Sequence, residues 1–139
     1  MIIPNHVHIL LSYNSPKTLN NFVGNGKRFI AYEIVERLKQ ANNKELLETL
    51  RSGVNKSDNK KGALHQVFEE SFEAKLCFSK KFIQQKLNYI HNNPCAKKWM
   101  LAVDPVSYLH SSALYYETGK QGIWGCNSWT EHLDSSLLL

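Results

Sequence analysis

The stretch Pro4-Asn5-His6-Val7-His8-Ile9-Leu10 stands near the start of the sequence, and the rest of the chain is interpreted around it. The apolar residues 9–11 follow the second histidine, which favours a buried β-strand. Successive side chains on a strand point to opposite faces, so we expect His6 and His8 to share a face and Val7 to point into a core. Two imidazoles in this arrangement can hold one divalent cation. The alternative is a pair of surface histidines on a half-exposed strand.

A second informative stretch, FIQQKLNYIHNNP, covers residues 82–94. It predicts a helix over residues 80–93, which Ser79 caps and Pro94 ends. Tyr89 and Asn93 are four residues apart and therefore lie on one helix face, from which both could point toward the histidine pair. The alternative for Tyr89 is a core tyrosine whose hydroxyl is hydrogen-bonded.

Three motifs together resemble a known family. PNHVHIL at residues 4–10, YIHNNP at 89–94 and SYLHSSALYY at 107–116 resemble the single-tyrosine HUH transposases, in particular the REP-associated tyrosine transposase branch. HUH denotes two histidines that flank a bulky apolar residue. The resemblance covers about residues 1–116, and the motifs occur in the order found in that family.

The resemblance implies a fold. The sequence pattern itself favours a sheet with helices, and the resemblance specifies an α+β domain with a ferredoxin-like antiparallel sheet and helices on one face. The family has a strand and a helix before the histidine motif that this chain lacks, so we expect a domain that is partial at its N-terminal side, over residues 1–116. Residues 117–139 are expected to form an irregular tail.

The resemblance also implies an activity, namely the metal-dependent cleavage and rejoining of single-stranded DNA at hairpin-forming repeat elements. Tyr89 would be the nucleophile that forms a covalent 5′-phosphotyrosine, and His6, His8 and Asn93 would hold Mg²⁺ or Mn²⁺. Two alternatives remain open. One is a catalytically inactive DNA-binding remnant of such a transposase, and the other is a metal-dependent phosphodiesterase without a covalent intermediate.

Composition sets broad limits on the class of protein. The chain has 139 residues, of which 42% are hydrophobic and 21% charged, which is typical of one globular domain. Its net charge of +5 is compatible with nucleic-acid binding and does not establish it. The three cysteines, Cys77, Cys95 and Cys126, form no CxxC pair, which favours reduced thiols in a cytoplasmic protein. No apolar run is long enough to predict a membrane span.

The region after the histidine motif predicts a helix over residues 16–40. Ser15 is expected to cap it and Pro16 to occupy its first turn, and apolar residues at helical spacing give it a buried face. Lys27 and Arg28 are the candidate DNA-binding residues of this helix, because the resemblance implies that it helps to hold DNA. The alternative is a solvated basic face on a packed helix.

The middle of the chain is less regular. We expect a short helix over residues 44–50 capped by Asn43, a mobile loop over 51–62, and a strand or bent strand pair over 65–78. The loop is basic and could touch a phosphate backbone, although a solvated linker is the simpler interpretation.

The last predicted elements follow the second motif. A final helical turn is expected to begin at Asp104, and residues 108–116 are expected to pack against the core. His91 could act as an acid or base, although an incidental role is the simpler interpretation. Because an incomplete sheet exposes a strand edge, we also expect the isolated chain to be marginally stable or self-associated, for example as a homodimer.

Overall fold

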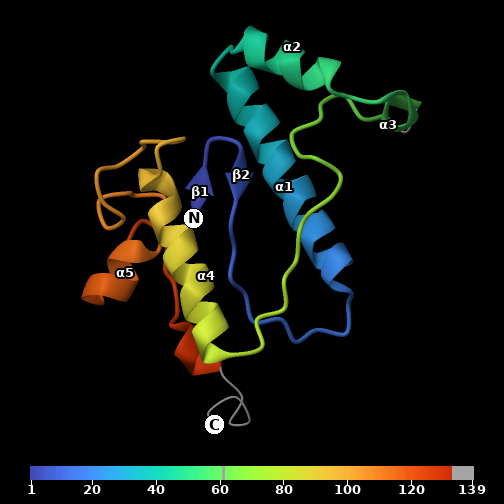
Figure 1. The fold of residues 1–139 in the computed structure, drawn as a ribbon. Helices are drawn as coiled ribbons and strands as arrows, with labels where there is room; N and C mark the ends of the chain where they lie inside the picture. The colour runs from blue at the N-terminus through green and yellow to red at the C-terminus, as the bar shows by residue number, and fades with distance from the viewer. Residues whose placement is uncertain (61, 133–139) are drawn as a thin grey trace. The chain divides into compact units, whose positions relative to one another are not determined.

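The computed structural model describes residues 1–60 and 62–132 (Figure 1). Within these residues the elements are β1 (Ile2–Ile3), β2 (His6–Val7), α1 (Leu19–Gln40), α2 (Lys44–Ser52), α3 (Lys56–Lys60), α4 (Lys80–Asn92), the 3₁₀ turn η1 (Asn93–Cys95), α5 (Ala113–Thr118) and the 3₁₀ turn η2 (Trp129–His132). The described part is therefore a mixture of helices with a small antiparallel sheet, which is compatible with an α+β class. None of the described helices is both long and apolar enough to cross a membrane.

The chain forms two compact units. The first combines Met1–Ser12 with the chain from Lys75 onward, and the second is Tyr13–Ala74. The first unit therefore holds the β-hairpin, α4 and α5, and the second unit holds α1, α2 and α3.

The first unit is built on an antiparallel hairpin in which Ile2 pairs with Val7 and Ile3 pairs with His6. Two further backbone bonds join Met1 and His8, since the Met1 amino group donates to the His8 carbonyl and the His8 amide donates to the Met1 carbonyl, each at 3.0 Å. The hairpin therefore spans Met1 to His8. The prediction of a longer strand is wrong, because residues 9–11 are not in a strand.

The two faces of the hairpin differ from expectation. Directly paired residues on antiparallel strands share a face, so His6 lies on the same face as its partner Ile3. Ile3 is only 3% exposed, whereas Val7 is 44% and Ile9 is 70% exposed. The prediction that Val7 enters a core is therefore wrong. The hairpin face that carries the histidines is the one that buries Ile3, whereas the opposite face, with Val7, is exposed.

The outer edge of β1 is hydrogen-bonded to a later segment. The Ile2 amide donates to the His110 carbonyl at 2.9 Å, and the Tyr108 hydroxyl donates to the Ile2 carbonyl at 2.7 Å. These bonds satisfy backbone groups that a two-stranded ribbon would otherwise leave unpaired. The hairpin is thus held from the side by residues 108–110.

Helix α4 provides the main packing surface of the first unit. Its N-terminus follows the prediction, because the Ser79 hydroxyl accepts a hydrogen bond from the Phe82 amide at 3.2 Å. Ile83, Leu87 and His91 recur every four residues and are buried, so they form one stripe along the helix. The helix ends at Asn92 as Pro94 predicts. Ala113 of α5 is fully buried, which confirms that the 108–116 region contributes to the core.

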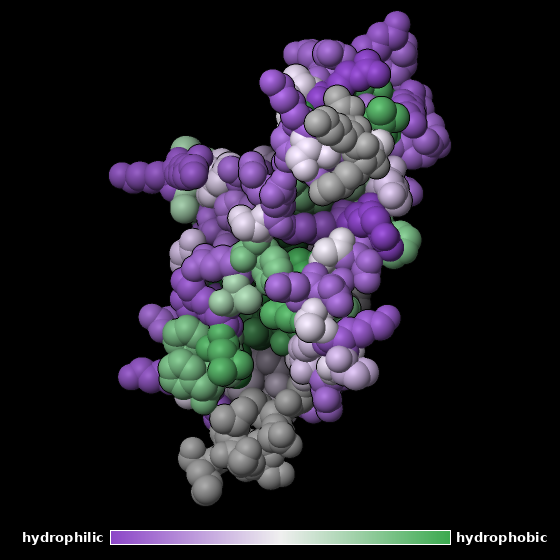
Figure 2. All heavy atoms as spheres, turned by 90° about the vertical axis from the view of Figure 1, so that its right-hand side faces the viewer, coloured by the Kyte–Doolittle hydropathy of each residue, from purple (hydrophilic) through white to green (hydrophobic). Residues whose placement is uncertain are grey.

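The second unit departs further from the sequence predictions. Helix α1 begins at Leu19 with Thr18 as its cap, so the prediction of a Ser15 cap is wrong. The Ser15 hydroxyl accepts instead from the Lys17 amide two residues later. No residue of α1 is buried, and Phe29 is 63% exposed. Figure 2 shows hydrophobic side chains at the surface among hydrophilic ones on the face that it presents.

The remaining predictions for the second unit have mixed outcomes. Asn43 caps α2 by accepting from the Leu46 amide at 3.1 Å, as predicted. Residues 51–62 are not all loop, since α2 continues to Ser52 and α3 follows. The strand expected over residues 65–78 is absent, and the segment is irregular. Its polar and apolar residues alternate only in part, which is too weak a pattern to define a paired face.

The packing of α4 predicts a clear difference between two leucines of the first unit. Leu87→Ala removes a side chain that is 3% exposed, so it should lower the free energy of unfolding by about 2–5 kcal/mol. Leu76→Ala is the matched control, because Leu76 is 85% exposed and should change stability by less than about 0.5 kcal/mol. All three tryptophans lie in the first unit, so urea unfolding followed by tryptophan fluorescence reports on it directly. Equal effects of the two substitutions would contradict this packing.

Candidate metal and nucleophile site

The hairpin brings the two motif histidines into direct contact. The Nε2 atoms of His6 and His8 lie 3.0 Å apart, and their rings meet edge to face with centroids 4.7 Å apart. His6 is exposed and His8 is half-buried. The i, i+2 spacing on an extended backbone gives this arrangement, because both side chains leave the same face.

The C-terminal end of α4 adds an amide and a phenol to the histidine pair. Asn93 follows the helix directly, and its Nδ2 lies 3.3 Å from His8 Nε2. The Tyr89 ring meets the His8 ring edge to face at 5.8 Å. Tyr89 in the last turn of α4 and Asn93, its C-terminal cap, are one turn apart, which places both side chains beside His8. All four residues belong to the first unit.

Tyr89 is 59% exposed. The alternative interpretation of Tyr89 as a core tyrosine is therefore wrong. Leu87 and His91, two residues before and two residues after Tyr89, lie on the buried stripe of the helix and are 3% and 6% exposed. The helix thus separates a packing face from a face on which Tyr89 is accessible.

Two further residues contact the pair and were not predicted as site residues. Asn5 places its Oδ1 atom 2.6 Å from His6 Nδ1. The Trp99 ring lies 5.9 Å from the His6 ring, and the Lys98 ammonium lies 4.9 Å from the Trp99 ring centroid. Asn5 is part of the motif itself, so its adjacency to His6 was a usable signal. Trp99 has no such signal, because its contact depends on how the chain turns after Pro94.

His91 lies on the buried side of α4 and has a structural role. Its Nε2 lies 3.0 Å from the Ser112 hydroxyl, and its ring packs against Tyr116 at 5.4 Å. Burial lowers the pKa of His91 below its usual range, the positive Met1 amino group lowers it further, and Glu117 opposes these effects. The buried imidazole, bonded to the Ser112 hydroxyl, ties α4 to the start of α5.

The donor set contains a histidine pair and an amide. Across residues 1–60 and 62–132, no three or more histidine, cysteine, aspartate and glutamate side chains gather where they could share a metal ion. Any metal at the hairpin would therefore depend on His6, His8 and the Asn93 amide, with the remaining positions left to water or substrate.

The candidate DNA-binding residues lie in the second unit. The Lys27 ammonium donates to the backbone carbonyls of Glu69 and Ser71, each at 2.8 Å, and lies 5.7 Å from the Phe72 ring centroid. Arg28 is exposed, with its guanidinium 5.2 Å from the Phe29 ring centroid. Lys27 therefore holds the 69–72 segment against α1, whereas Arg28 points its charge into solvent.

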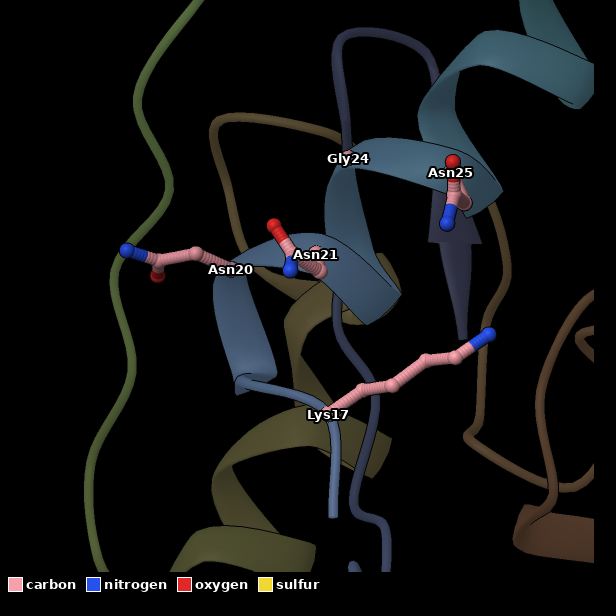
Figure 3. Close-up of a pocket in the computed structure, with 5 residues that line it drawn as sticks. All are labelled: Lys17, Asn20, Asn21, Gly24 and Asn25. Carbon is pink, nitrogen blue, oxygen red and sulfur yellow. The ribbon is translucent and has the colours of Figure 1, made fainter. Parts of the chain in front are cut away.

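The first turns of α1 border an open groove in the second unit. Figure 3 shows the residues that line it, which are Lys17, Asn20, Asn21, Gly24 and Asn25. The lining is mostly amide groups, which are neutral donors and acceptors. The groove shares no lining residue with the histidine site.

We found no match to this chain among known protein families, curated proteins or solved structures. The resemblance to the single-tyrosine HUH transposases therefore remains a hypothesis carried by the sequence motifs, and the geometry above has to support any function on its own.

The contacts of Lys27 predict a structural effect of its removal. Lys27→Ala eliminates both hydrogen bonds to the 69–72 segment, so a glutamate-specific protease should cut after Glu69 or Glu70 several-fold faster than in the unmodified chain. Arg28→Ala is the control, because it removes a similar charge from the next residue, whose guanidinium lies over the Phe29 ring. Mass spectrometry of the fragments locates the cuts. Identical cleavage rates in the two variants would mean that Lys27 does not restrain the segment.

Proposed function

We propose that this chain cleaves and rejoins single-stranded DNA through a covalent tyrosine intermediate with the help of a divalent metal ion. The observation that carries the proposal is the meeting of His6, His8, Asn93 and Tyr89 at one place, although His8 and Asn93 are 85 positions apart in the sequence. The DNA transposition implied by the sequence motifs is the reaction class that uses such a set.

The donor atoms fit a divalent cation. Two nitrogen ligands about 2.1 Å from a cation and at right angles to each other are about 3.0 Å apart, and the two Nε2 atoms have this separation. The Asn93 amide turns its Nδ2 toward His8, and a half-turn about its Cβ–Cγ bond would present Oδ1, the atom that binds metals. Asn93 also stands at the C-terminus of α4, where the helix dipole favours positive charge.

The chemistry follows from the residues. A bound Mg²⁺ or Mn²⁺ supplies charge that polarises the scissile phosphate and orients it. The Tyr89 hydroxyl loses its proton and its oxygen forms a bond to phosphorus, while the bond from phosphorus to the 3′ oxygen breaks and that oxygen takes up a proton. The products are a 5′-phosphotyrosine and a free 3′ hydroxyl. Because the phosphotyrosine is itself a phosphodiester, rejoining needs no external energy source.

The fold and the DNA contacts form part of the same proposal. The fold that belongs to this proposal is a ferredoxin-like plan, in which helices cover one face of an antiparallel sheet. Single-stranded DNA that forms hairpins is the proposed substrate. Arg28 is the better candidate of the two basic residues for a phosphate contact, because two donors of Lys27 are already used by backbone carbonyls.

The proposed metal site predicts the effect of removing its ligands. His6→Ala and His8→Ala should each weaken Mn²⁺ binding by at least about tenfold, because each removes one of the few protein ligands. His110→Ala is the control, since His110 is an exposed histidine of the same unit that packs against Tyr108 and Trp124. Electron paramagnetic resonance of free Mn²⁺ during a titration gives the affinities. Equal binding by all three variants would contradict the site.

The nucleophile assignment predicts the fate of a covalent adduct. With single-stranded hairpin DNA and Mg²⁺ or Mn²⁺, the chain should form a protein–DNA adduct that survives a denaturing gel, and Tyr89→Phe should abolish it. Tyr32→Phe is a matched control, because Tyr32 is 65% exposed and Tyr89 is 59% exposed. Tyr116 is a poorer control, since its hydroxyl accepts from the Trp129 amide and is partly buried.

The outcomes separate the alternatives. An adduct that persists in Tyr89→Phe would overturn the nucleophile assignment. DNA cleavage without any adduct would favour a phosphodiesterase that uses water. DNA binding without cleavage by the unmodified chain would favour the non-catalytic remnant of a transposase.

A further inference from the structure

The contact between Asn5 and His6 constrains where the His6 imidazole carries its hydrogen. Asn5 Oδ1 lies 2.6 Å from His6 Nδ1, and an amide oxygen accepts hydrogen bonds without donating them. With the Asn5 amide in this orientation, His6 Nδ1 is the ring nitrogen that carries the hydrogen. In a neutral imidazole the other nitrogen then has a lone pair, and His6 Nε2 is the atom that faces His8.

We propose that Asn5 is a positioning residue that holds His6 in the tautomer able to bind a metal through Nε2. This inference rests on the proposed function for the identity of the bound species, a divalent cation. Metal-binding histidines commonly donate their second ring hydrogen to an oxygen acceptor, which fixes both the tautomer and the ring orientation. Asn5 supplies that acceptor from the residue next to the ligand.

The hairpin turn explains why a short amide can do this. Pro4 and Asn5 form the turn between β1 and β2, and His6 begins β2. The proline ring restricts the backbone immediately before Asn5. The Asn5 side chain therefore reaches the His6 ring from a restrained position, and the Trp99 ring lies against the same imidazole. His6 is exposed to solvent, so these two contacts and the contact with His8 are what restrain the rotamer of its ring.

The proposal also accounts for the short distance between the histidines. Two Nε2 atoms 3.0 Å apart repel each other if both carry hydrogen or if both present lone pairs to empty space. With His6 Nε2 as a lone pair, His8 Nε2 donates to it when no cation is bound, and the Asn93 amide then presents Oδ1 in place of Nδ2 to His8 Nε2. A cation between the two nitrogens would replace that hydrogen and satisfy both lone pairs.

The first test reads the tautomer directly, without metal or DNA. In ¹⁵N-labelled protein at a pH where the imidazoles are neutral, His6 should show a protonated Nδ1 and an unprotonated Nε2. Asn5→Ala should shift His6 toward the Nε2-protonated form. Asn5→Asp should keep the Nδ1-protonated form, because a carboxylate accepts the same hydrogen bond.

The second test measures Mn²⁺ affinity in the same variants by the resonance signal of free Mn²⁺. Asn5→Ala should weaken binding by about 10–100-fold, and Asn5→Asp should bind at least as tightly as the unmodified chain. Asn127→Ala is the matched control and should bind normally, because Asn127 contributes its backbone carbonyl to the hydrogen bond with Tyr116. Urea unfolding followed by tryptophan fluorescence checks that the variants remain folded.

The outcomes distinguish this inference from the proposed function. A protonated His6 Nε2 in the unmodified chain would overturn the role of Asn5, as would a tautomer that does not change in Asn5→Ala. If Asn5→Ala fails to fold, tight Mn²⁺ binding and a retained tautomer in Asn5→Asp support the role, and their loss overturns it. Absence of Mn²⁺ binding in the unmodified chain would overturn the proposed metal-dependent function, while the tautomer still decides whether Asn5 positions His6.

Discussion

The backbone hydrogen bonds of the Met1–His8 hairpin are the constraint on which the candidate site depends. They fix the pleat, and the pleat puts His6 and His8 on the face that also carries the buried Ile3. A shift of the register by one residue would move both histidines to the opposite face together. The hydrogen bonds from residues 108–110 to Ile2 oppose such a shift, because they hold the outer edge of β1 in place.

The C-terminal end of helix α4 provides the other two residues of the site, Tyr89 and Asn93. The Ser79 cap and the buried stripe of Ile83, Leu87 and His91 determine how the helix is placed and rotated within the first unit. Pro94 then stops the helix, so that the half-buried Asn93 lies beside His8. Packing on one side of α4 therefore determines which polar groups meet the histidines on the other side.

The sequence predicted the local features of the site and missed those that depend on distant partners. The alternation of His6 and His8, the Ser79 and Asn43 caps and the stop at Pro94 follow from short-range rules, and the structure has them. The face assignment of Val7 was wrong because alternation gives two faces and does not say which one is buried. That choice depends on Ile3, α4 and the later segment at 108–110, none of which the motif encodes.

The same reason explains the errors in the second unit. A capping residue is recognisable wherever serine, threonine or asparagine precedes an apolar periodic segment, and both Ser15 and Thr18 meet this rule before α1. In the structure Thr18 is the cap, because its hydroxyl accepts from the Asn21 amide, whereas the Ser15 hydroxyl accepts from the Lys17 amide before the helix begins. The strand expected over 65–78 needed a neighbour to pair with, and a pattern in one segment cannot supply that neighbour.

On helix α4 the residue proposed for the chemistry is exposed, and the residues that stabilise the fold are buried. On α4, Leu87 is 3% exposed and Tyr89, two residues later, is 59% exposed, so one helix carries both a core and an accessible phenol. The hydroxyl of Tyr89 can therefore be removed without opening a cavity, whereas His91 cannot be changed without leaving the buried face around Ser112 incomplete. A tyrosine kept for packing would be expected on the buried stripe. Its place on the exposed side, beside a histidine ring, is the arrangement that the proposed nucleophile requires.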